Sequence, residues 1–239
     1  MPNQGGSGER RSSDSYDLNP ILGTPEIEVP LQECHLNATG TDWTILHSGA
    51  VLTQTDEYRF YHEPREIHPF GLALWPSAIA LAHEVAMRAN AFERTRVLEL
   101  GAGTGLPGIA AASLGADVVQ TDNHKVALSL CQQNGRRNGV VDQIEYRLAS
   151  WGAWDDDTEY DWILGSDILY NRDQHPNLHR IFETNLRHGG TILLSDPFRH
   201  TSIEFLELLE GEGWSITMNR WTLGDDDLVR PVGVFELRL

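Results

Sequence analysis

The sequence predicts an α/β fold: a Rossmann-like, doubly wound sheet of seven strands, mostly parallel, with an antiparallel C-terminal hairpin strand at one edge. Three observations predict it. Short apolar runs alternate with helical patterns from residue 76 onward. A glycine-rich turn joins the first of these runs to a helix. The last two apolar runs have no helix between them, which indicates an antiparallel pair.

The N-terminal part differs in composition from the rest. Residues 1–20 are rich in glycine, serine and charge, so we expect a disordered tail. Residues 21–70 are expected to form a small N-terminal β-appendage, because turn residues separate three short β-rich runs, EIEVPLQ, DWTILHS and EYRFY. Residues 71–239 are expected to form the main domain.

Each element of the main domain has its own signal. Pro76 predicts a helix start, and apolar residues then recur at spacings of three and four through about Asn90. Thr201 and Glu204 match a capping box that would start a later helix. The expected strands are VLEL, DVVQTD, IEYRLAS, WILGSD, TILLSD, WSITMNRW and VGVFELRL; the other expected helices are LPGIAAASLG, KVALSLCQQNGRRN and a segment from about Leu178 that ends at Gly189-Gly190.

Composition narrows the classes of function. The 239 residues include 35 acidic and 18 basic side chains, and the net charge of -17 would repel nucleic acid. The two cysteines lack CxxC spacing, which favours a reducing cytoplasm. The first twenty residues contain no apolar signal segment, and no later run is long enough for a membrane span. We therefore expect a cytoplasmic protein without nucleic-acid or membrane partners; oligomeric state has no signal here.

The stretch VLELGAGTGLPG carries the strongest motif. Gly101, Gly103 and Gly105 allow tight turns and let a ligand approach the backbone beside a helix N-terminus. Part of the stretch matches the GxGxxG fingerprint, so a dinucleotide remains an alternative. Glu99 is poorly placed for a pyrophosphate and instead suits a ligand with a cationic end.

Ligands of open α/β sheets bind beyond the carboxyl ends of the strands, so residues at those ends are informative. Asp122 follows the second strand, where a carboxylate can bind ribose hydroxyls, although it would also suit a helix cap. Trp151 follows the third strand and offers a surface for adenine, or a core aromatic. Asp167 and Tyr170 follow the fourth strand and would place a carboxylate and a ring in the same crevice.

Together these residues resemble a class I S-adenosylmethionine-dependent methyltransferase. The runs Leu74-Trp75-Pro76-Ser77-Ala78 and Ser150-Trp151-Gly152, and the DxxY formed by Asp167 and Tyr170, resemble the seven-β-strand protein-lysine methyltransferases of family 16. The short run from Ser195 to Arg199 also resembles the flavoprotein-directed branch. The resemblance implies S-adenosyl-L-methionine as cofactor, S-adenosyl-L-homocysteine as product, and cofactor contacts from Trp75, Gly101, Ala102, Gly103, Trp151 and Ser166, the last standing where alanine is common.

The expected reaction is methyl transfer to a nitrogen, with an accessible lysine of a protein substrate as the main candidate. Asp167 would orient the incoming amine, and Tyr170 would pack against its stem or head by cation–π contact. A small-molecule N-methyltransferase, a non-catalytic S-adenosylmethionine-binding module and a dinucleotide oxidoreductase remain alternatives. His175 and His179 lie four apart on an expected helix without a third ligand, so we expect a solvated face and no metal.

Overall fold

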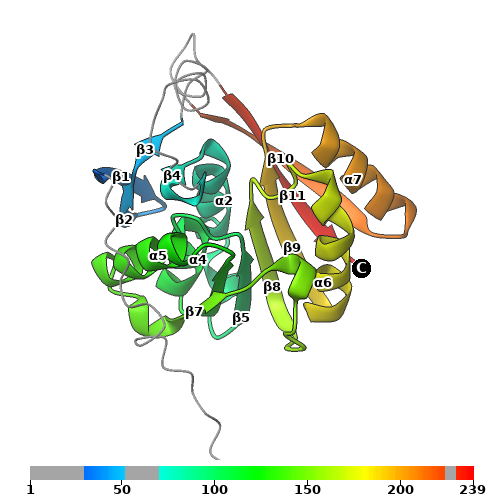
Figure 1. Ribbon diagram of the computed structural model, residues 1–239, viewed down its shortest axis with the longest axis horizontal. Coiled ribbons are helices and arrows are strands. Elements are labelled where there is room, and N and C mark those ends of the chain that lie inside the picture. The colour runs from blue at the N-terminus through cyan, green and yellow to red at the C-terminus, as the bar shows by residue number, and fades with distance from the viewer. Residues whose placement is uncertain (1–29, 52–69, 224–229) are drawn as a thin grey trace, which may run out of the picture.

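The computed structural model describes residues 30–51, 70–223 and 230–239 (Figure 1). Its centre is a seven-stranded sheet in the order β10-β11-β9-β8-β5-β6-β7. Within it β11 pairs antiparallel with β9 and β10, whereas the other five strands are parallel. The predicted fold class, including the antiparallel hairpin at one edge, is confirmed. The strands are β5 (Arg96–Leu100), β6 (Asp117–Asp122), β7 (Ile144–Leu148), β8 (Tyr160–Ser166), β9 (Leu186–Asp196), β10 (Ser215–Leu223) and β11 (Arg230–Arg238).

Helices cover both faces of the sheet (Figure 1). One core lies under α2, α4 and α5, and a second lies under α6 and α7. Because side chains alternate along a strand, Val97 of β5 enters the first core and Leu98 enters the second. No helix in the described ranges has the length and apolar character needed to cross a bilayer. The helices are α2 (Pro76–Ala86), α3 (Ala89–Phe92), α4 (Leu106–Ser113), α5 (Lys125–Arg137), α6 (His175–Asn185) and α7 (His200–Gly211).

Two local predictions in the main domain were wrong. The helix expected to reach Gly189-Gly190 ends at Asn185, because Leu186 pairs with Tyr160 and begins β9. The capping box is not formed either. α7 begins at His200, so Thr201 lies inside its first turn and donates its hydroxyl to the Leu169 carbonyl at 3.3 Å. In both cases a distant partner competes successfully with the local pattern.

The N-terminal hairpin packs against α5 through a ladder of amide side chains. It consists of β1 (Gln32–Ala38) and β2 (Thr41–His47), which turn at Thr39-Gly40. Asn134 and Asn138 lie one helical turn apart, and each bonds both backbone groups of one β2 residue, Leu46 and Thr44 respectively. These bonds satisfy the outer backbone groups of an edge strand.

This hairpin differs in part from the expected appendage. Of the run EIEVPLQ, the structure describes only the last three residues, and β1 begins at the last of them, Gln32; the strand predicted at DWTILHS corresponds to β2. The run EYRFY and the tail of residues 1–20 fall outside the described residues. A short parallel pair, β3 (Gly49–Ala50) with β4 (Ala73–Leu74), joins the appendage to the residues before α2.

We expect Gly108→Ala to destabilise the protein although alanine favours helices. A Cβ at Gly108 would lie 2.4 Å from Glu99 Oε2 and 2.6 Å from Gln120 Nε2, both in the core. Overpacking of about 1–3 kcal/mol, plus a strained buried hydrogen bond, outweighs a helix-propensity gain of about 1 kcal/mol. Urea unfolding should show a net loss of about 2 kcal/mol. Gly211→Ala, where a Cβ meets nothing within 4 Å, is the control and should gain about 0.5 kcal/mol; equal effects would contradict the prediction.

Candidate active site

The glycine loop connects β5 to α4 through three residues in the left-handed backbone region. Gly101, Gly103 and Gly105 have φ values of 62°, 57° and 80°. Ala102 lies between them, is buried, and donates its N–H to the Thr121 carbonyl at 2.9 Å. Its bond fixes the loop to the end of β6. The three glycines therefore meet a conformational requirement that other L residues satisfy only with strain.

Side chains and backbone from other elements enclose this loop. A Cβ on Gly101 would lie 3.3 Å from the Trp151 ring, and one on Gly103 would lie 3.3 Å from the Gly71 carbonyl oxygen. Trp151 begins the short helix η3 (Trp151–Ala153) after β7, and Gly71 belongs to η1 (Phe70–Leu72) before β4. The loop thus lies between an aromatic ring on one side and a backbone segment on the other.

Asp122 lies beside the same loop. It ends β6, and its Oδ2 accepts the Gly103 N–H at 3.1 Å while Oδ1 accepts the His124 N–H at 2.9 Å. Asp122 is 8% exposed. Burial raises the pKa of its carboxyl group, and the two backbone hydrogen bonds oppose this rise. A carboxylate has about four acceptor positions, so Asp122 retains capacity for ligand hydroxyls.

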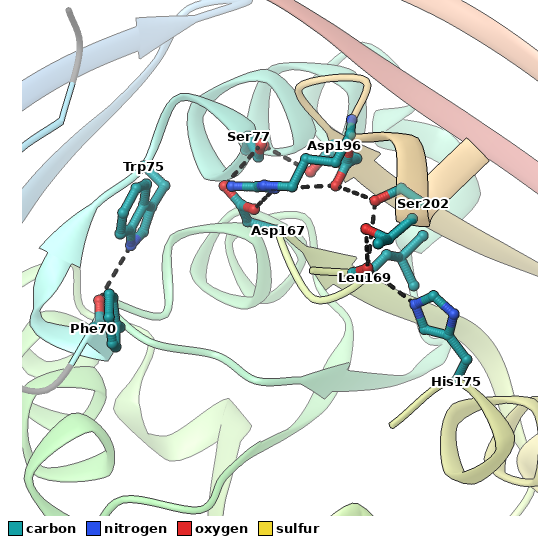
Figure 2. Close-up of polar contacts among 11 residues, drawn as sticks. Phe70, Trp75, Ser77, Asp167, Leu169, His175, Asp196 and Ser202 are labelled. Atoms are coloured by element: carbon teal, nitrogen blue, oxygen red, sulfur yellow. Dashed lines mark hydrogen bonds and ion pairs between the residues drawn. The ribbon is translucent and has the colours of Figure 1, made fainter. Parts of the chain in front are cut away.

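Trp75 and Ser166 complete the predicted cofactor set at this edge of the sheet. Trp75 precedes α2, is partly buried, and donates its Nε1–H to the Phe70 carbonyl at 3.1 Å (Figure 2). Ser166 ends β8 and is in register with Ser195 of β9. The glycine-loop backbone and side chains from separate strands and from the start of α2 therefore surround one region.

Glu99 lies beneath the loop. It is 0% exposed, and its Oε2 accepts the Gly108 N–H at 3.1 Å and the Gln120 amide at 2.6 Å. Its Oε1 is buried and has no hydrogen-bond partner among the described residues. Burial raises the pKa of Glu99 to about 8. The contacts of Glu99 in the described chain are thus with protein, and the role expected for it at a cationic ligand stays a prediction.

The raised pKa of Glu99 makes stability depend on pH. The folded protein keeps a proton on Glu99 that the unfolded chain releases near its ordinary pKa of 4.5, so this contribution is lost as pH rises toward 8. Glu99→Gln is neutral throughout and removes that loss. Chemical unfolding at about pH 5 and about pH 8 should show the variant gaining stability relative to the wild type as pH rises. Parallel pH profiles for the two proteins would contradict the assignment.

Asp167 is the centre of a polar network (Figure 2). It follows β8 with a φ of 58°, and its backbone N–H donates to the Ser195 carbonyl at 2.8 Å. Its Oδ1 is paired with the guanidinium of Arg199, and its Oδ2 accepts the Ser77 hydroxyl at a long 3.4 Å. Burial raises the pKa of Asp167, whereas Arg199 opposes the rise. A non-glycine residue held with positive φ, in a polar network, is typical of a functional site.

Tyr170, the other predicted catalytic residue, is exposed at the mouth of this region. Tyr170 is 60% exposed, whereas the neighbouring residues Ile168 and Leu169 are buried. Burial raises the pKa of its hydroxyl, and the nearby negative charges of Asp122 and Asp167 raise it further. Tyr170 is therefore close enough to both carboxylates to be influenced by them, and its ring is accessible to a large acceptor.

Sequence reasoning missed several members of the network. Asp196 ends β9, is 0% exposed, and accepts the Ser202 hydroxyl at 2.7 Å (Figure 2). Asp196 and Ser77 could have been found by applying the strand-end and helix-start rules to every element, because both lie at such ends. Arg199 lies in the run from Ser195 to Arg199, whose only signal in the sequence is its resemblance to the flavoprotein-directed branch.

The expectation for His175 was wrong. It is 8% exposed, stacks on Phe205 at 4.4 Å between ring centroids, and its Nε2 lies 3.0 Å from the Leu169 carbonyl (Figure 2). Only His179 is partly exposed, beside Glu212. His175, the first residue of α6, instead helps to hold the DxxY turn through its contact with the Leu169 carbonyl. In the described part of the chain, no three His, Cys, Asp or Glu side chains are placed to hold a metal ion.

The sheet order and this edge-of-sheet site define the class: a Rossmann-like methyltransferase fold. The structure resembles magnesium protoporphyrin IX methyltransferase from Synechocystis PCC 6803 (TM-score 0.53, 16% identity, 79% of this chain and 93% of that one). It also resembles precorrin-6y C5,15-methyltransferase from Geobacter metallireducens GS-15 (TM-score 0.56, 15% identity, 65% of this chain and 86% of that one).

The lysine methyltransferase family model matches residues 56–212, and the chain belongs to this family. Protein N-lysine methyltransferase METTL21A of Xenopus tropicalis is 34% identical over 142 residues, which cover 57% of this chain and 66% of that protein. Histone-arginine methyltransferase METTL23 of Mus musculus is 34% identical over 114 residues, which cover 45% of each protein. The chain thus spans 66% of the length of the METTL21A protein and 45% of the length of the METTL23 protein.

Proposed function

We propose that the protein is an S-adenosylmethionine-dependent methyltransferase that modifies the side-chain amine of a lysine in a protein substrate. The observation that carries the proposal is the position of Asp167: a largely buried carboxylate at the carboxyl ends of the parallel strands, where the glycine loop and Asp122 also lie. Membership of the lysine methyltransferase family and the similarity to protein N-lysine methyltransferase METTL21A support a lysine acceptor.

The described residues fit the cofactor. The backbone of Gly101 and Gly103 is bare where a Cβ would crowd neighbouring groups, Asp122 can accept ribose hydroxyls, and Trp151 offers a ring face beside the loop. When bound, the cofactor supplies a sulfonium methyl group, and S-adenosyl-L-homocysteine leaves as the new N–C bond replaces the C–S bond. Holding two reactants in line can contribute about 7–11 kcal/mol, so positioning is the main task of the chain's own residues.

Asp167 and Tyr170 would handle the acceptor. A lysine amine, with an ordinary pKa of about 10.4, must lose a proton to solvent before its lone pair can attack. Asp167 Oδ2 would then accept an N–H of the neutral amine and direct its lone pair. The exposed Tyr170 ring would pack along the methylene stem and bind the cationic product head. The net charge of -17 favours encounter with a basic acceptor surface.

Two measurements test the proposed function. Calorimetry should show binding of S-adenosylmethionine and none of NAD; the reverse would indicate a dinucleotide enzyme. Labelled methyl groups should then be transferred from the cofactor to lysate material that is sensitive to protease but resistant to nuclease. Acid hydrolysis should recover methyl-lysine. Methyl-arginine would instead favour an arginine acceptor, as in the similar histone-arginine methyltransferase METTL23. Label in small molecules would favour a small-molecule N-methyltransferase, and binding without transfer would indicate a non-catalytic module.

We further propose a cytoplasmic location. Both cysteines, Cys34 and Cys131, are free thiols, and burial raises the pKa of each. Free thiols are compatible with a reducing compartment. Fractionation of the cells that produce the protein tests this location: the protein should be detected in the cytosolic fraction and not in the membrane fraction.

A further inference from the structure

Arg199 joins two carboxylates, Asp167 and Asp196, at the carboxyl ends of β8 and β9. Its Nη1 pairs with Asp167 Oδ1 and lies 3.1 Å from Asp196 Oδ2. Asp196 is itself fixed, because its oxygens accept the Arg199 backbone N–H and the Ser202 hydroxyl, each at 2.7 Å. Arg199 is therefore held at two points: Asp196 binds its backbone N–H, and Asp167 and Asp196 both bind its guanidinium. Figure 2 shows the labelled Asp167, Asp196 and Ser202 within this chain of contacts.

The charges of this triad matter for an incoming amine. Asp167 and Asp196 carry two negative charges, and Arg199 offsets one of them. Burial acts to lower the pKa of Arg199, but the two carboxylates raise it overall, so the guanidinium stays charged. Two uncompensated carboxylates would hold a lysine in its ammonium form, since a nearby opposite charge favours the charged state. A triad with net charge -1 holds the proton less tightly.

The geometry leaves one oxygen of Asp167 for the acceptor. Arg199 engages Oδ1, whereas the one described partner of Oδ2 is the Ser77 hydroxyl at 3.4 Å, near the limit of a hydrogen bond. We propose that Arg199 is a positioning residue: it fixes Asp167 so that Oδ2 receives the acceptor nitrogen, and it reduces the negative charge that would otherwise keep that nitrogen protonated. This inference rests on the proposed function and assigns a role that Asp167 alone does not explain.

The other groups around Asp167 do not duplicate this role. From α2 the described contact is the neutral Ser77 hydroxyl, and from the segment after β9 it is Arg199 with Asp196 behind it. Tyr170, on the same turn as Asp167, is influenced by Asp122, Asp167 and Arg199 and has a raised pKa. It therefore stays neutral near pH 7. Arg199 is thus the cation that acts on Asp167 within the described residues.

The test compares Arg199→Gln, Arg199→Lys and a control, Arg187→Gln. Arg187 also pairs with an aspartate, Asp161, but is exposed beside the start of β8, at the opposite end of the strands from Asp167. For each purified full-length protein, the cofactor Kd is measured by calorimetry, and kcat and KM for the methyl acceptor are measured from about pH 6 to about pH 10.

We expect Arg199→Gln to retain the cofactor Kd within about twofold, to lose about tenfold in kcat near pH 7, and to move its rate profile upward by about one pH unit. Arg199→Lys keeps the charge but not the fixed fork, so its pH profile should match the wild type with a smaller loss in kcat. Arg187→Gln should match the wild type throughout. Such a split between Kd, kcat and pH profile would not arise from loosened packing alone.

Failure of the inference is distinguishable from failure of the proposed function. A wild type that binds S-adenosylmethionine but methylates no amine acceptor overturns the function, whatever the variants do. An active wild type with an Arg199→Gln rate profile superimposable on its own overturns the role of Arg199. If Arg199→Gln is unfolded, Arg199→Lys decides: an unshifted pH profile supports the inference, whereas a shifted profile or loss of folding means that Arg199 acts structurally.

Discussion

Asp167→Asn is expected to lower kcat by about a hundredfold while leaving cofactor binding nearly unchanged. Asparagine has almost the same shape as aspartate, so the turn after β8 and its bond to the Ser195 carbonyl should persist. The substitution removes the negative charge that Arg199 and the acceptor both require. It also introduces a side-chain amide in place of the carboxylate. If its NH₂ group faces the acceptor, it cannot accept a hydrogen bond from the amine.

The measurement is single-turnover methyl transfer at saturating cofactor, beside calorimetric binding of S-adenosylmethionine. Asp117→Asn is the matched control, because Asp117 is an exposed aspartate at the start of β6, at the opposite end of the strands from Asp167. It should retain the wild-type rate. Normal methyl transfer by Asp167→Asn, with normal cofactor affinity, would exclude Asp167 from catalysis and leave it as a fixed member of the polar network.

The carboxyl-edge part of the site was predictable because parallel strands align their ends. Each of Gly101, Asp122, Trp151 and Asp167 follows a different apolar run, and the structure brings them to one edge of the sheet. That inference needs only the strand positions and the rule that ligands bind beyond the carboxyl ends. The fold class followed from the same alternation of strands and helices.

The position of Glu99 shows a signal that was present but unused. Side chains alternate along β5, so Val97 and Glu99 share one face while Leu98 and Leu100 share the other. Val97 packs in the core beneath α4. Glu99 therefore points under that helix, where it meets Gly108 and Gln120. Two residues further along, the chain leaves the strand, which is why the backbone of Gly101 lies beside Trp151 at the end of the sheet and Glu99 lies below the loop.

Other features had no local signal. Leu186 suits a helix face and a strand equally well, and only its pairing with Tyr160 decides for β9. Arg199 could have paired with any of several acidic side chains. Its contact with Asp167 depends on how the chain leaves β9, and this depends on the Asp196 side chain accepting the Arg199 backbone N–H. Ion pairs across 32 residues are determined by tertiary structure, which no spacing rule specifies.

Gly103→Ala is expected to weaken cofactor binding by at least about tenfold, through the loss of space and not through backbone strain alone. The φ of 57° is one that alanine adopts at a cost of about 1–2 kcal/mol. In addition, the new Cβ would lie 3.3 Å from the Gly71 carbonyl oxygen, so η1 must shift from its position over the loop. The bond from the Gly103 N–H to Asp122 would be disturbed with it.

Gly139→Ala separates these two causes. Gly139 follows α5 with a φ of 71°, so alanine there carries comparable strain, yet its Cβ would meet nothing within 4 Å. Both variants should lose about 1–2 kcal/mol of unfolding free energy, but only Gly103→Ala should lose affinity for S-adenosylmethionine in calorimetry. If the two variants bind the cofactor equally well, the backbone at Gly103 is not part of the cofactor cradle. A selective loss at Gly103 would mean that the cradle depends on the contact between the glycine loop and η1, two segments separated by four elements of the chain.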